Sequence, residues 1–156
     1  MVAFSSAAVA WAIAIPLAPV LTASRNDGRL PRLAGSVIFV VGSVVCHQKP
    51  ERSFTLAGQP LPVCARCTGI YIGAALAVLA MAGVASAAQF PVSAFDASYA
   101  RRGVLAASMP TLATLVWEWT SGTMPSNAVR AAAGLPLGAA IAWIIWWSAR
   151  SRRQSR

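Results

Sequence analysis

The residues best suited to chemistry are three cysteines and the chain's only histidine, which share one short polar interruption of an otherwise apolar sequence. Cys46 and His47 open this interruption, and Cys64 and Cys67 close it as a Cys-x-x-Cys pair. Thiolate sulfur and imidazole nitrogen are the usual ligands of tetrahedral zinc, and such a pair with further ligands at a distance commonly holds it. The sequence therefore predicts a metal site formed by these four residues, with zinc as the expected metal.

Other interpretations of the same four residues stay open. A closed structural zinc would join the two ends of the loop, whereas three protein ligands and a water would leave an open position for a substrate. His47 is either the fourth ligand or a hydrogen-bonding partner of a ligand, because adjacent ligands are geometrically awkward. The spacing of Cys64 and Cys67 also fits a thiol–disulfide pair with Cys46 as a resolving thiol. Ordinary buried or free cysteines are the remaining interpretation.

The predicted position of Cys64 and Cys67 at the start of an apolar helix favours the metal-binding form of both thiols. Unpaired N–H groups and the helix dipole stabilise a thiolate at such a position. Arg66 lies between the two cysteines in the sequence and adds a positive charge. That charge lowers the pKa of nearby thiols further and also stabilises a bound anion.

Three arginines, Arg52, Arg66 and Arg130, are predicted near the cysteines at the same face of the membrane. We expect them to converge with Asn127 on a pocket for a small anionic ligand, because guanidinium groups bind anionic oxygens through paired hydrogen bonds. Glu118 is a candidate general base, or a carboxylate that orients these arginines. In the competing interpretation the arginines contact lipid phosphate, or Glu118 and Arg130 form a single ion pair that closes the bundle.

Composition places the chain in a membrane. Hydrophobic residues make up 57% of the 156 residues, and apolar stretches approach the roughly 20 residues that cross about 30 Å of hydrocarbon. The net charge of +9 would suggest nucleic acid in a soluble protein, but the arginines cluster beside apolar segments, where such charges set membrane topology. No nucleic-acid-binding motif or aromatic–basic patch is present in the sequence. The lipid bilayer is therefore the expected partner, and nucleic acid is not.

Apolar segments predict an all-α membrane protein, with residues 1–156 as a single transmembrane domain in which about five helices form a compact bundle. The second segment is short, so four crossings are the alternative, with this segment tilted or partly re-entrant. The predicted spans are residues 2–21, 33–45, 67–88, 103–119 and 127–147.

Basic residues predict the orientation of these spans. A five-span arrangement puts nine arginines on one side and only Lys49, Arg52, Arg66 and Arg130 on the other. The positive-inside rule then places the amino terminus outside and the carboxyl terminus in the cytoplasm. Residues 46–66 become an extracytoplasmic Cys/His loop, and residues 148–156 become a basic cytoplasmic tail. The nine arginines are Arg25, Arg29, Arg32, Arg101, Arg102, Arg150, Arg152, Arg153 and Arg156.

Small and polar residues predict local features of the third and fifth spans. Gly69 and Gly73 form a Gly-x-x-x-Gly face, which we expect to pack against the second or the fifth span, because small residues let helices approach closely in lipid. At the start of the fifth span, Ser126 or Asn127 is expected to cap the helix.

The motifs around the cysteines resemble those of domain-of-unknown-function family 2085, a family of uncharacterised bacterial membrane proteins. The resemblance is carried by CHQ at residues 46–48, RSF at 52–54, CARCTGIYIG at 64–73, Trp117-Glu118, Ser126-Asn127, Arg130 and Gly134. An Asp is expected in the family where this chain has Glu118. The resemblance implies a bacterial cytoplasmic (inner) membrane, and it implies no particular reaction or substrate.

The sequence thus predicts a membrane protein with an extracytoplasmic Cys/His metal site, zinc expected, beside an arginine-rich pocket. The alternative from the enzyme class is a membrane thiol–disulfide oxidoreductase that uses Cys64 and Cys67. A structural or accessory subunit, in which the zinc only holds the loop, is a third hypothesis. The sequence specifies neither an enzyme activity nor an oligomeric state.

Overall fold

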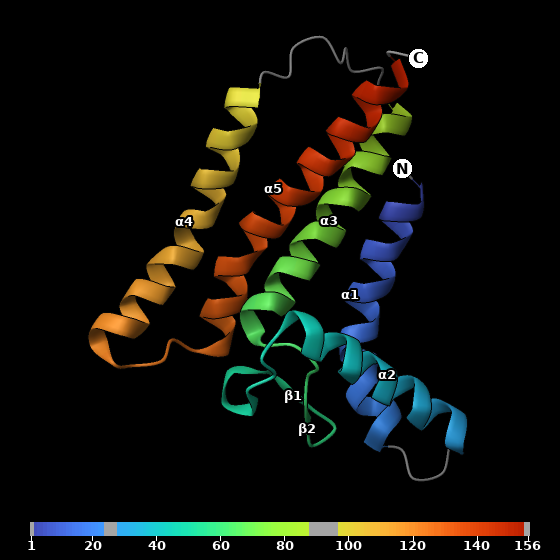
Figure 1. Ribbon diagram of the computed structural model, residues 1–156, viewed down its shortest axis with the longest axis vertical. Coiled ribbons are helices and arrows are strands. Elements are labelled where there is room, and N and C mark those ends of the chain that lie inside the picture. The colour runs from blue at the N-terminus through green and yellow to red at the C-terminus, as the bar shows by residue number, and fades with distance from the viewer. Residues whose placement is uncertain (1, 24–27, 88–96, 155–156) are drawn as a thin grey trace.

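Five α-helices make up most of the chain in a computed structural model, which describes residues 2–23, 28–87 and 97–154. Arg25 and Arg156, two of the arginines used to predict sidedness, lie outside the described residues. The helices run in the order blue to red in Figure 1. They are α1 (Val2–Ala23), α2 (Arg29–Val45), α3 (Ala65–Ala87), α4 (Ala97–Ser121) and α5 (Asn127–Gln154).

The loop between α2 and α3 carries the remaining regular structure. It contains a short 3-10 helix, η1 (Pro50–Arg52), and an antiparallel hairpin of β1 (Thr55–Leu56) and β2 (Gln59–Pro60). The two-residue turn of the hairpin, Ala57 and Gly58, has positive φ at both positions, as tight hairpin turns require. The all-α prediction is therefore right for the body of the molecule and misses this small hairpin.

Helices α3 and α5 form the centre of the bundle, where glycines allow their backbones to touch. A side chain at any of four glycines would collide with the partner helix, so only glycine permits this approach. The prediction that Gly69 and Gly73 pack against the second or the fifth span is confirmed for the fifth. The contacts are Gly69 with Ala131, Gly73 with Leu135, Gly134 with Arg66 and Gly138 with Ile70.

The loop that carries the cysteines rests on α1. Ile15 of α1 is buried together with Leu61 and Val63 of the loop, and Cys46 and Cys67 pack against this cluster. Burial of three aliphatic side chains contributes roughly 1.5–3 kcal/mol each, which holds the loop against the bundle. The cysteine positions therefore depend on packing against the first helix as well as on α3.

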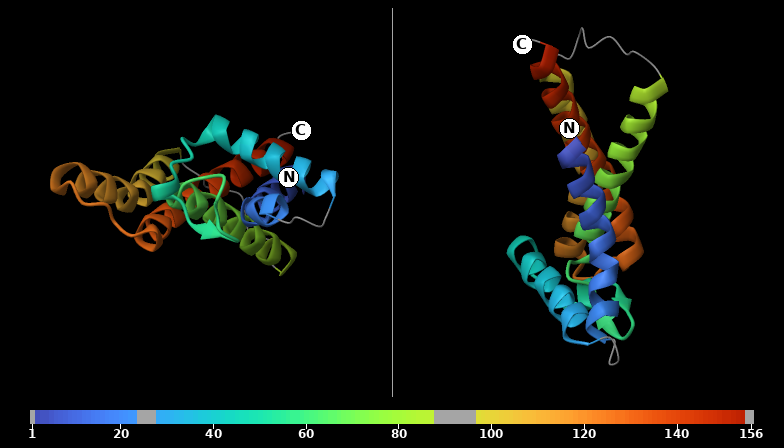
Figure 2. Two further views of the ribbon diagram at one scale, coloured as in Figure 1. Left: turned by 90° about the horizontal axis from the view of Figure 1, so that it is seen from below. Right: turned by 90° about the vertical axis from the view of Figure 1, so that its right-hand side faces the viewer.

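Helix α2 departs from the predicted second span. It has 17 residues and crosses the lower end of the bundle obliquely instead of running alongside α3 and α5 (Figures 1 and 2). Gly35 contacts Thr22 and Leu21 of α1, and Gly42 contacts Pro62. Small residues thus form the face that touches the protein, while Leu30, Leu33, Val37, Val40, Val41 and Val44 are exposed.

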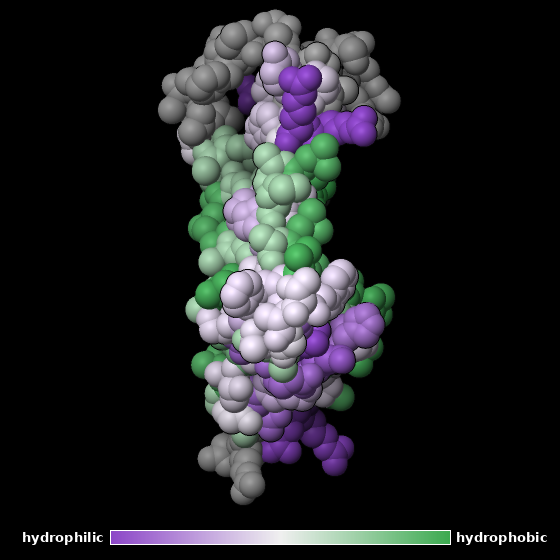
Figure 3. Space-filling model, turned by 90° about the vertical axis from the view of Figure 1, so that its left-hand side faces the viewer, coloured by the Kyte–Doolittle hydropathy of each residue, from purple (hydrophilic) through white to green (hydrophobic). Residues whose placement is uncertain are grey.

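Three of the described helices are long and apolar enough to cross a membrane by length and composition: residues 3–23 in α1, 65–83 in α3 and 127–150 in α5. Helix α4, with 25 residues, is not among these three; it contains Arg101, Arg102 and Glu118. Figure 3 shows hydrophobic residues around the middle of one face and hydrophilic residues towards both ends. This distribution agrees with a membrane protein.

The ends of the helices differ from the five-span prediction. The start of α1 and the end of α5 lie towards the same end of the bundle, and the cysteine loop lies at the other (Figure 1). The two termini are therefore not on opposite sides in this arrangement, because α2 does not traverse the bundle. Helix α5 continues to Gln154, through most of the segment 148–156 that the sequence predicts as a tail.

Candidate metal centre and arginine cluster

The three cysteines come together at the end of the bundle where α2 ends and α3 begins. Cys46 directly follows α2, Cys64 directly precedes α3, and Cys67 lies in its first turn. Their sulfur atoms all lie within 4.8 Å of one another. Since tetrahedral zinc has Zn–S bonds of about 2.3 Å, bound sulfurs are about 3.8 Å apart. Small side-chain movements would bring this group to that spacing.

Backbone hydrogen bonds place these sulfurs. The N–H of Cys64 donates to Sγ of Cys46 at 3.2 Å. The N–H of Cys46 donates to the carbonyl of Gly42 at 2.9 Å and so ends α2. At the start of α3, Thr68 donates from both its N–H and its hydroxyl to the carbonyl of Cys64. Each cysteine therefore occupies a defined helix end.

Gln48 joins the two sides of this site and was not singled out from the sequence. Its Nε2 donates to the carbonyl of Phe39 at 2.6 Å and to the carbonyl of Pro62 at 2.8 Å. Gln48 has a φ of 48°, an uncommon value for a residue other than glycine. The side chain thus links α2 to the segment before Cys64. Its place directly after Cys46 and His47 was the only sequence signal.

The thiol of Cys64 is acidic for a cysteine. A hydrogen bond from the Cys67 side chain is the main cause that lowers the pKa of Cys64 to about 5, and burial opposes it in part. Further hydrogen bonds from the backbone of Cys67 and Arg66 and from the side chain of Cys46 act in the same direction. A thiolate at Cys64 near neutral pH is the form that binds metal.

His47 lies apart from the three sulfurs. Within the part of the chain that the structure describes, the close group of possible metal ligands consists of the three cysteines and does not include His47. The histidine is exposed. As the fourth ligand its imidazole would have to turn towards the sulfurs, so this role stays a prediction.

The arginines converge on a single carboxylate. Glu118, at the end of α4, meets Nη2 of Arg52 at 2.9 Å, Nη2 of Arg130 at 3.0 Å and Nη2 of Arg66 at 3.8 Å. These arginines come from η1, α3 and α5. The structure therefore brings together three of the residues predicted to bind an anion, with the candidate base Glu118 at their centre.

Burial within this cluster is graded. The side chains of Arg130 and Glu118 are 3% and 7% exposed, Arg66 is 16% exposed, and Arg52 is 38% exposed. Arg130 therefore forms the closed floor of the cluster, and Arg52 forms its solvent-facing rim.

Neighbouring polar residues hold Arg66 and the η1 segment of the cluster in place. Arg66 donates from Nη2 to the hydroxyl of Thr114 at 3.2 Å. Asn127, predicted as a ligand residue, donates from Nδ2 to the carbonyl of Ser53 at 2.9 Å and so ties η1 to the start of α5. Ser126 caps α5, because its Oγ accepts the N–H of Val129 at 3.3 Å. The predicted cap is confirmed for Ser126, whereas Asn127 holds the loop.

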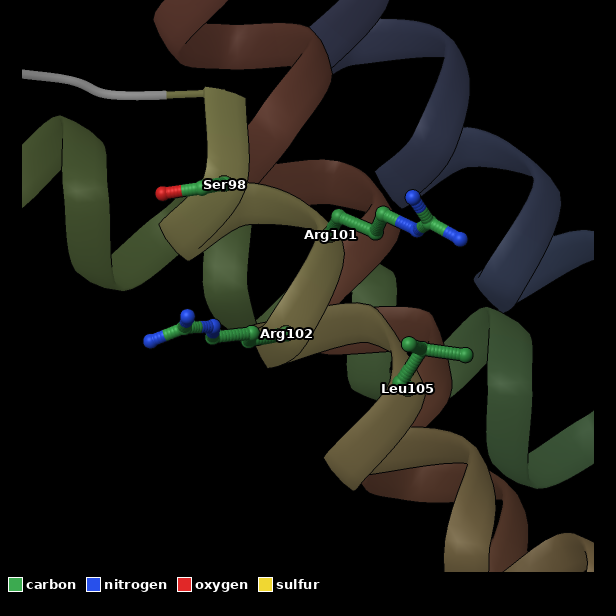
Figure 4. Close-up of a pocket in the computed structure, with 4 residues that line it drawn as sticks. All are labelled: Ser98, Arg101, Arg102 and Leu105. Atoms are coloured by element: carbon green, nitrogen blue, oxygen red, sulfur yellow. The ribbon is translucent and has the colours of Figure 1, made fainter.

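A separate hollow lies at the other end of α4. It has a volume of about 530 Å³ and is lined by Ser98, Arg101, Arg102 and Leu105 (Figure 4). Figure 4 shows Arg101 and Arg102 extending to different sides of the helix. Because these two guanidinium groups do not converge, the hollow does not form a second arginine cluster.

Comparison with known proteins identifies relatives of this site. A family model described as "Predicted membrane protein (DUF2085)" matches residues 46–144, which include the three cysteines and every member of the arginine cluster. No solved structure matches the chain significantly.

Two similar proteins are archaeal. An uncharacterized protein of Methanothermobacter thermautotrophicus is 39% identical over 101 residues, which cover 63% of this chain and 81% of the relative. An uncharacterized protein of Methanocaldococcus jannaschii is 38% identical over 61 residues, 39% of each protein, so the chain matches well under half of that relative's length. These relatives do not support the expectation of a bacterial source. Because the family match spans more than half of the chain, the protein belongs to the DUF2085 family of predicted membrane proteins.

Proposed function

We propose that this membrane protein holds a metal ion, with zinc expected, through Cys46, Cys64 and Cys67, beside an arginine pocket that binds an anion. The observation that carries the proposal is the grouping of the three sulfurs within 4.8 Å. Two helix ends and a hairpin loop are needed to bring them there. Among the common divalent ions that have no redox chemistry, zinc is the one that thiolate ligands select.

The fourth position of the metal has two candidates. His47 directly follows Cys46 and would complete a closed structural site. A water or a ligand atom would instead leave an open site with Lewis-acid character. His47 is exposed, so its imidazole would have to rotate inward to become the fourth ligand. This rotation distinguishes the closed site from the open one.

Glu118 is proposed to hold the arginines in place. Its carboxylate is shared by three guanidinium groups. A carboxylate engaged in this way serves better as an orienting group than as a general base. The pocket therefore supplies positive charge and hydrogen-bond donors.

In the proposed membrane arrangement, α1, α3, α4 and α5 cross the bilayer and α2 lies at its surface. Both termini then lie on one side. Arg101, Arg102 and Arg150 belong to that end of the helices, and Arg29, Arg32 and Lys49 belong to the end that carries the cysteines, so basic residues do not by themselves orient this four-crossing arrangement. If the cysteine loop faces outward, as the sequence predicts, this arrangement puts the amino terminus in the cytoplasm together with the carboxyl terminus.

Metal analysis of purified protein tests the proposal. The full chain would be purified in detergent without chelators and under reducing conditions, and its metal content measured by inductively coupled plasma mass spectrometry. We expect about one zinc per chain, lost in Cys64→Ser and Cys67→Ser. His47→Ala separates the two arrangements, because loss of a ligand or of its supporting partner weakens metal affinity by at least about 10–100-fold.

Other results of the metal analysis would contradict the proposal. Protein without stoichiometric metal, in which all three thiols react freely with a maleimide, would contradict the metal site. A disulfide between Cys64 and Cys67 in metal-free protein from cells would instead favour the oxidoreductase alternative.

A further inference from the structure

The arginine cluster is not balanced in charge. Arg52, Arg66 and Arg130 carry three positive charges and Glu118 carries one negative charge, which leaves an excess of two. We propose that the cluster is a binding site for a phosphate monoester dianion, and this rests on the anion pocket of the proposed function. Buried charges are costly unless they are paired, and a dianion would neutralise the cluster.

Several donors in the cluster have no partner. Nε of Arg52, Nε of Arg66, and Nε and Nη2 of Arg130 are buried without a hydrogen-bond acceptor. Nη2 of Arg130 lies 3.0 Å from Oε2 of Glu118 as an ion pair, but the contact lacks hydrogen-bonding geometry. Buried donors of this kind are uncommon in folded proteins. Their number calls for a ligand with several acceptor oxygens.

The protein backbone adds positive potential at the same end. Helices α3 and α5 both begin there (Figure 1), and Arg66 and Arg130 each lie within the first turns of their helix. Helix amino termini carry about half a positive charge and favour bound anions, phosphate above all. Two such termini act on the cluster in addition to its guanidinium groups.

The chemistry of the cluster favours a phosphate monoester over other anions. A carboxylate or a phosphate diester carries a single negative charge and would leave the cluster positive. A phosphate monoester carries about −1.5 to −2 at pH 7 and offers three terminal oxygens. Arginine binds these oxygens through two parallel hydrogen bonds. Both the charge and the number of donors therefore match this class.

Exposed tryptophans beside Glu118 support a position of the cluster at the level of the lipid headgroups. Trp117 and Trp119 flank Glu118 in the sequence and are 60% and 78% exposed, and tryptophan is enriched at the boundary between headgroups and hydrocarbon. The rim residue Arg52 gives access from the aqueous side. A phosphate monoester could thus arrive on a lipid or free in solution, and both sources present the same chemistry.

A binding experiment with defined probes separates these sources. Wild-type protein in neutral detergent would be titrated with dioctanoyl phosphatidic acid, inorganic phosphate, and dioctanoyl phosphatidylglycerol as the diester control. Tryptophan fluorescence and the thermal midpoint would report binding. We expect phosphatidic acid or inorganic phosphate to bind at least about tenfold more tightly than the diester, the difference expected from one lost charge-assisted hydrogen bond.

Matched variants test whether the cluster is responsible. Arg52→Gln removes a rim donor and should weaken monoester binding about tenfold, while Lys49→Gln, with the same charge change at a nearby exposed position, should leave it unchanged. Arg52→Lys keeps the charge but loses the planar fork and should fall between them. If Arg52→Gln does not fold, Arg52→Lys provides the comparison.

The outcomes separate this proposal from the metal site. Tight binding of phosphatidic acid alone assigns a lipid source, and comparable binding of inorganic phosphate assigns a soluble one; both support the proposal. Equal binding of the diester, or equal loss in Lys49→Gln and the Arg52 variants, would overturn it. Metal content measured on the same samples decides the metal site independently, because none of these variants changes a cysteine.

Discussion

Arg130 in the first turns of α5 meets Glu118 at the end of α4, with Nη2 and Oε2 3.0 Å apart and both side chains almost fully buried. The contact joins two helices that are connected only by residues 122–126. Since Arg52 and Arg66 reach the same carboxylate, Glu118 also connects η1 and α3 to this corner. One carboxylate thus links four segments at the end of the bundle that holds the cysteines.

Glu118→Gln should destabilise the protein strongly. Removing one partner from a buried ion pair leaves the other charge without compensation, which costs about 3–5 kcal/mol. The free energy of unfolding would be measured by denaturant titration in detergent, in buffer without phosphate. Glu51→Gln is the matched control, because Glu51 is exposed and has the same charge. Equal stability of the two variants would show that Glu118 does not hold this corner.

Metal removal should lower stability through the cysteine site. A ligand that binds only the folded state stabilises it by about 4 kcal/mol when present at a thousandfold excess over its dissociation constant. Chelation should therefore lower the thermal midpoint of the wild-type protein and leave that of Cys67→Ser unchanged. Calorimetry or a fluorescence melt measures both. A chelator effect of the same size in Cys67→Ser would place the metal elsewhere.

Gly138→Ala should weaken the contact between α3 and α5. An added Cβ at Gly138 would collide with the backbone of Ile70, whereas a Cβ at Gly103 meets no atom within 4 Å. Overpacking typically costs about 1–3 kcal/mol, so Gly138→Ala should lower the free energy of unfolding by that amount. Gly103→Ala should leave it unchanged or raise it slightly. The opposite order would mean that the two helices do not pack through their glycines.

Alkylation of Cys64 in metal-free protein should depend on pH in an unusual way. The hydrogen bond from Cys67 lowers the pKa of Cys64 to about 5, so the reactive thiolate predominates at pH 6.5. An unperturbed thiol with a pKa of about 8.5 is then about 1% ionised. Iodoacetamide labelling followed by peptide mass spectrometry should show the Cys64 rate levelling off above about pH 6.

Ionisation of the Cys64 thiol also changes the free energy of unfolding in a definite direction. Because the folded pKa lies below the unfolded one, the ionised thiol favours folding; the contribution is complete above the unfolded pKa, about 8.5, and disappears as the pH falls through about 5. Cys64→Ser should remove this part of the pH dependence. A labelling rate for Cys64 that rises up to pH 8.5 would contradict the lowered pKa.

Features set by short stretches of sequence were predictable. The apolar composition indicates membrane helices, because the hydrocarbon interior excludes backbone polar groups that are not paired within a helix or a closed barrel. The Gly69 and Gly73 spacing predicted a close helix contact, and Ser126 was correctly considered a helix cap. In each case the physical cause acts within one helix or one turn, so the sequence pattern contains it.

The structure decided features that depend on packing between distant segments. The tilt of α2 follows from contacts of Gly35 with α1 and of Gly42 with Pro62, and neither contact can be read from hydropathy. The five-span prediction treated this helix as a crossing, whereas α2 runs obliquely across the end of the bundle. Gln48 was likewise missed, because its two acceptors lie 9 and 14 residues away.

The sequence alone determined that this chain has membrane-like helices and three cysteines at the edge of an apolar span, since both follow from residue type and spacing. Only the tertiary structure decided that Arg52, Arg66 and Arg130 share Glu118. The sequence also allowed each arginine to contact lipid, or one of them to form a separate ion pair. These residues come from four segments, and their meeting depends on the packing of α3 and α4 against α5. Helix packing therefore creates the charge excess from which an anion site can be inferred.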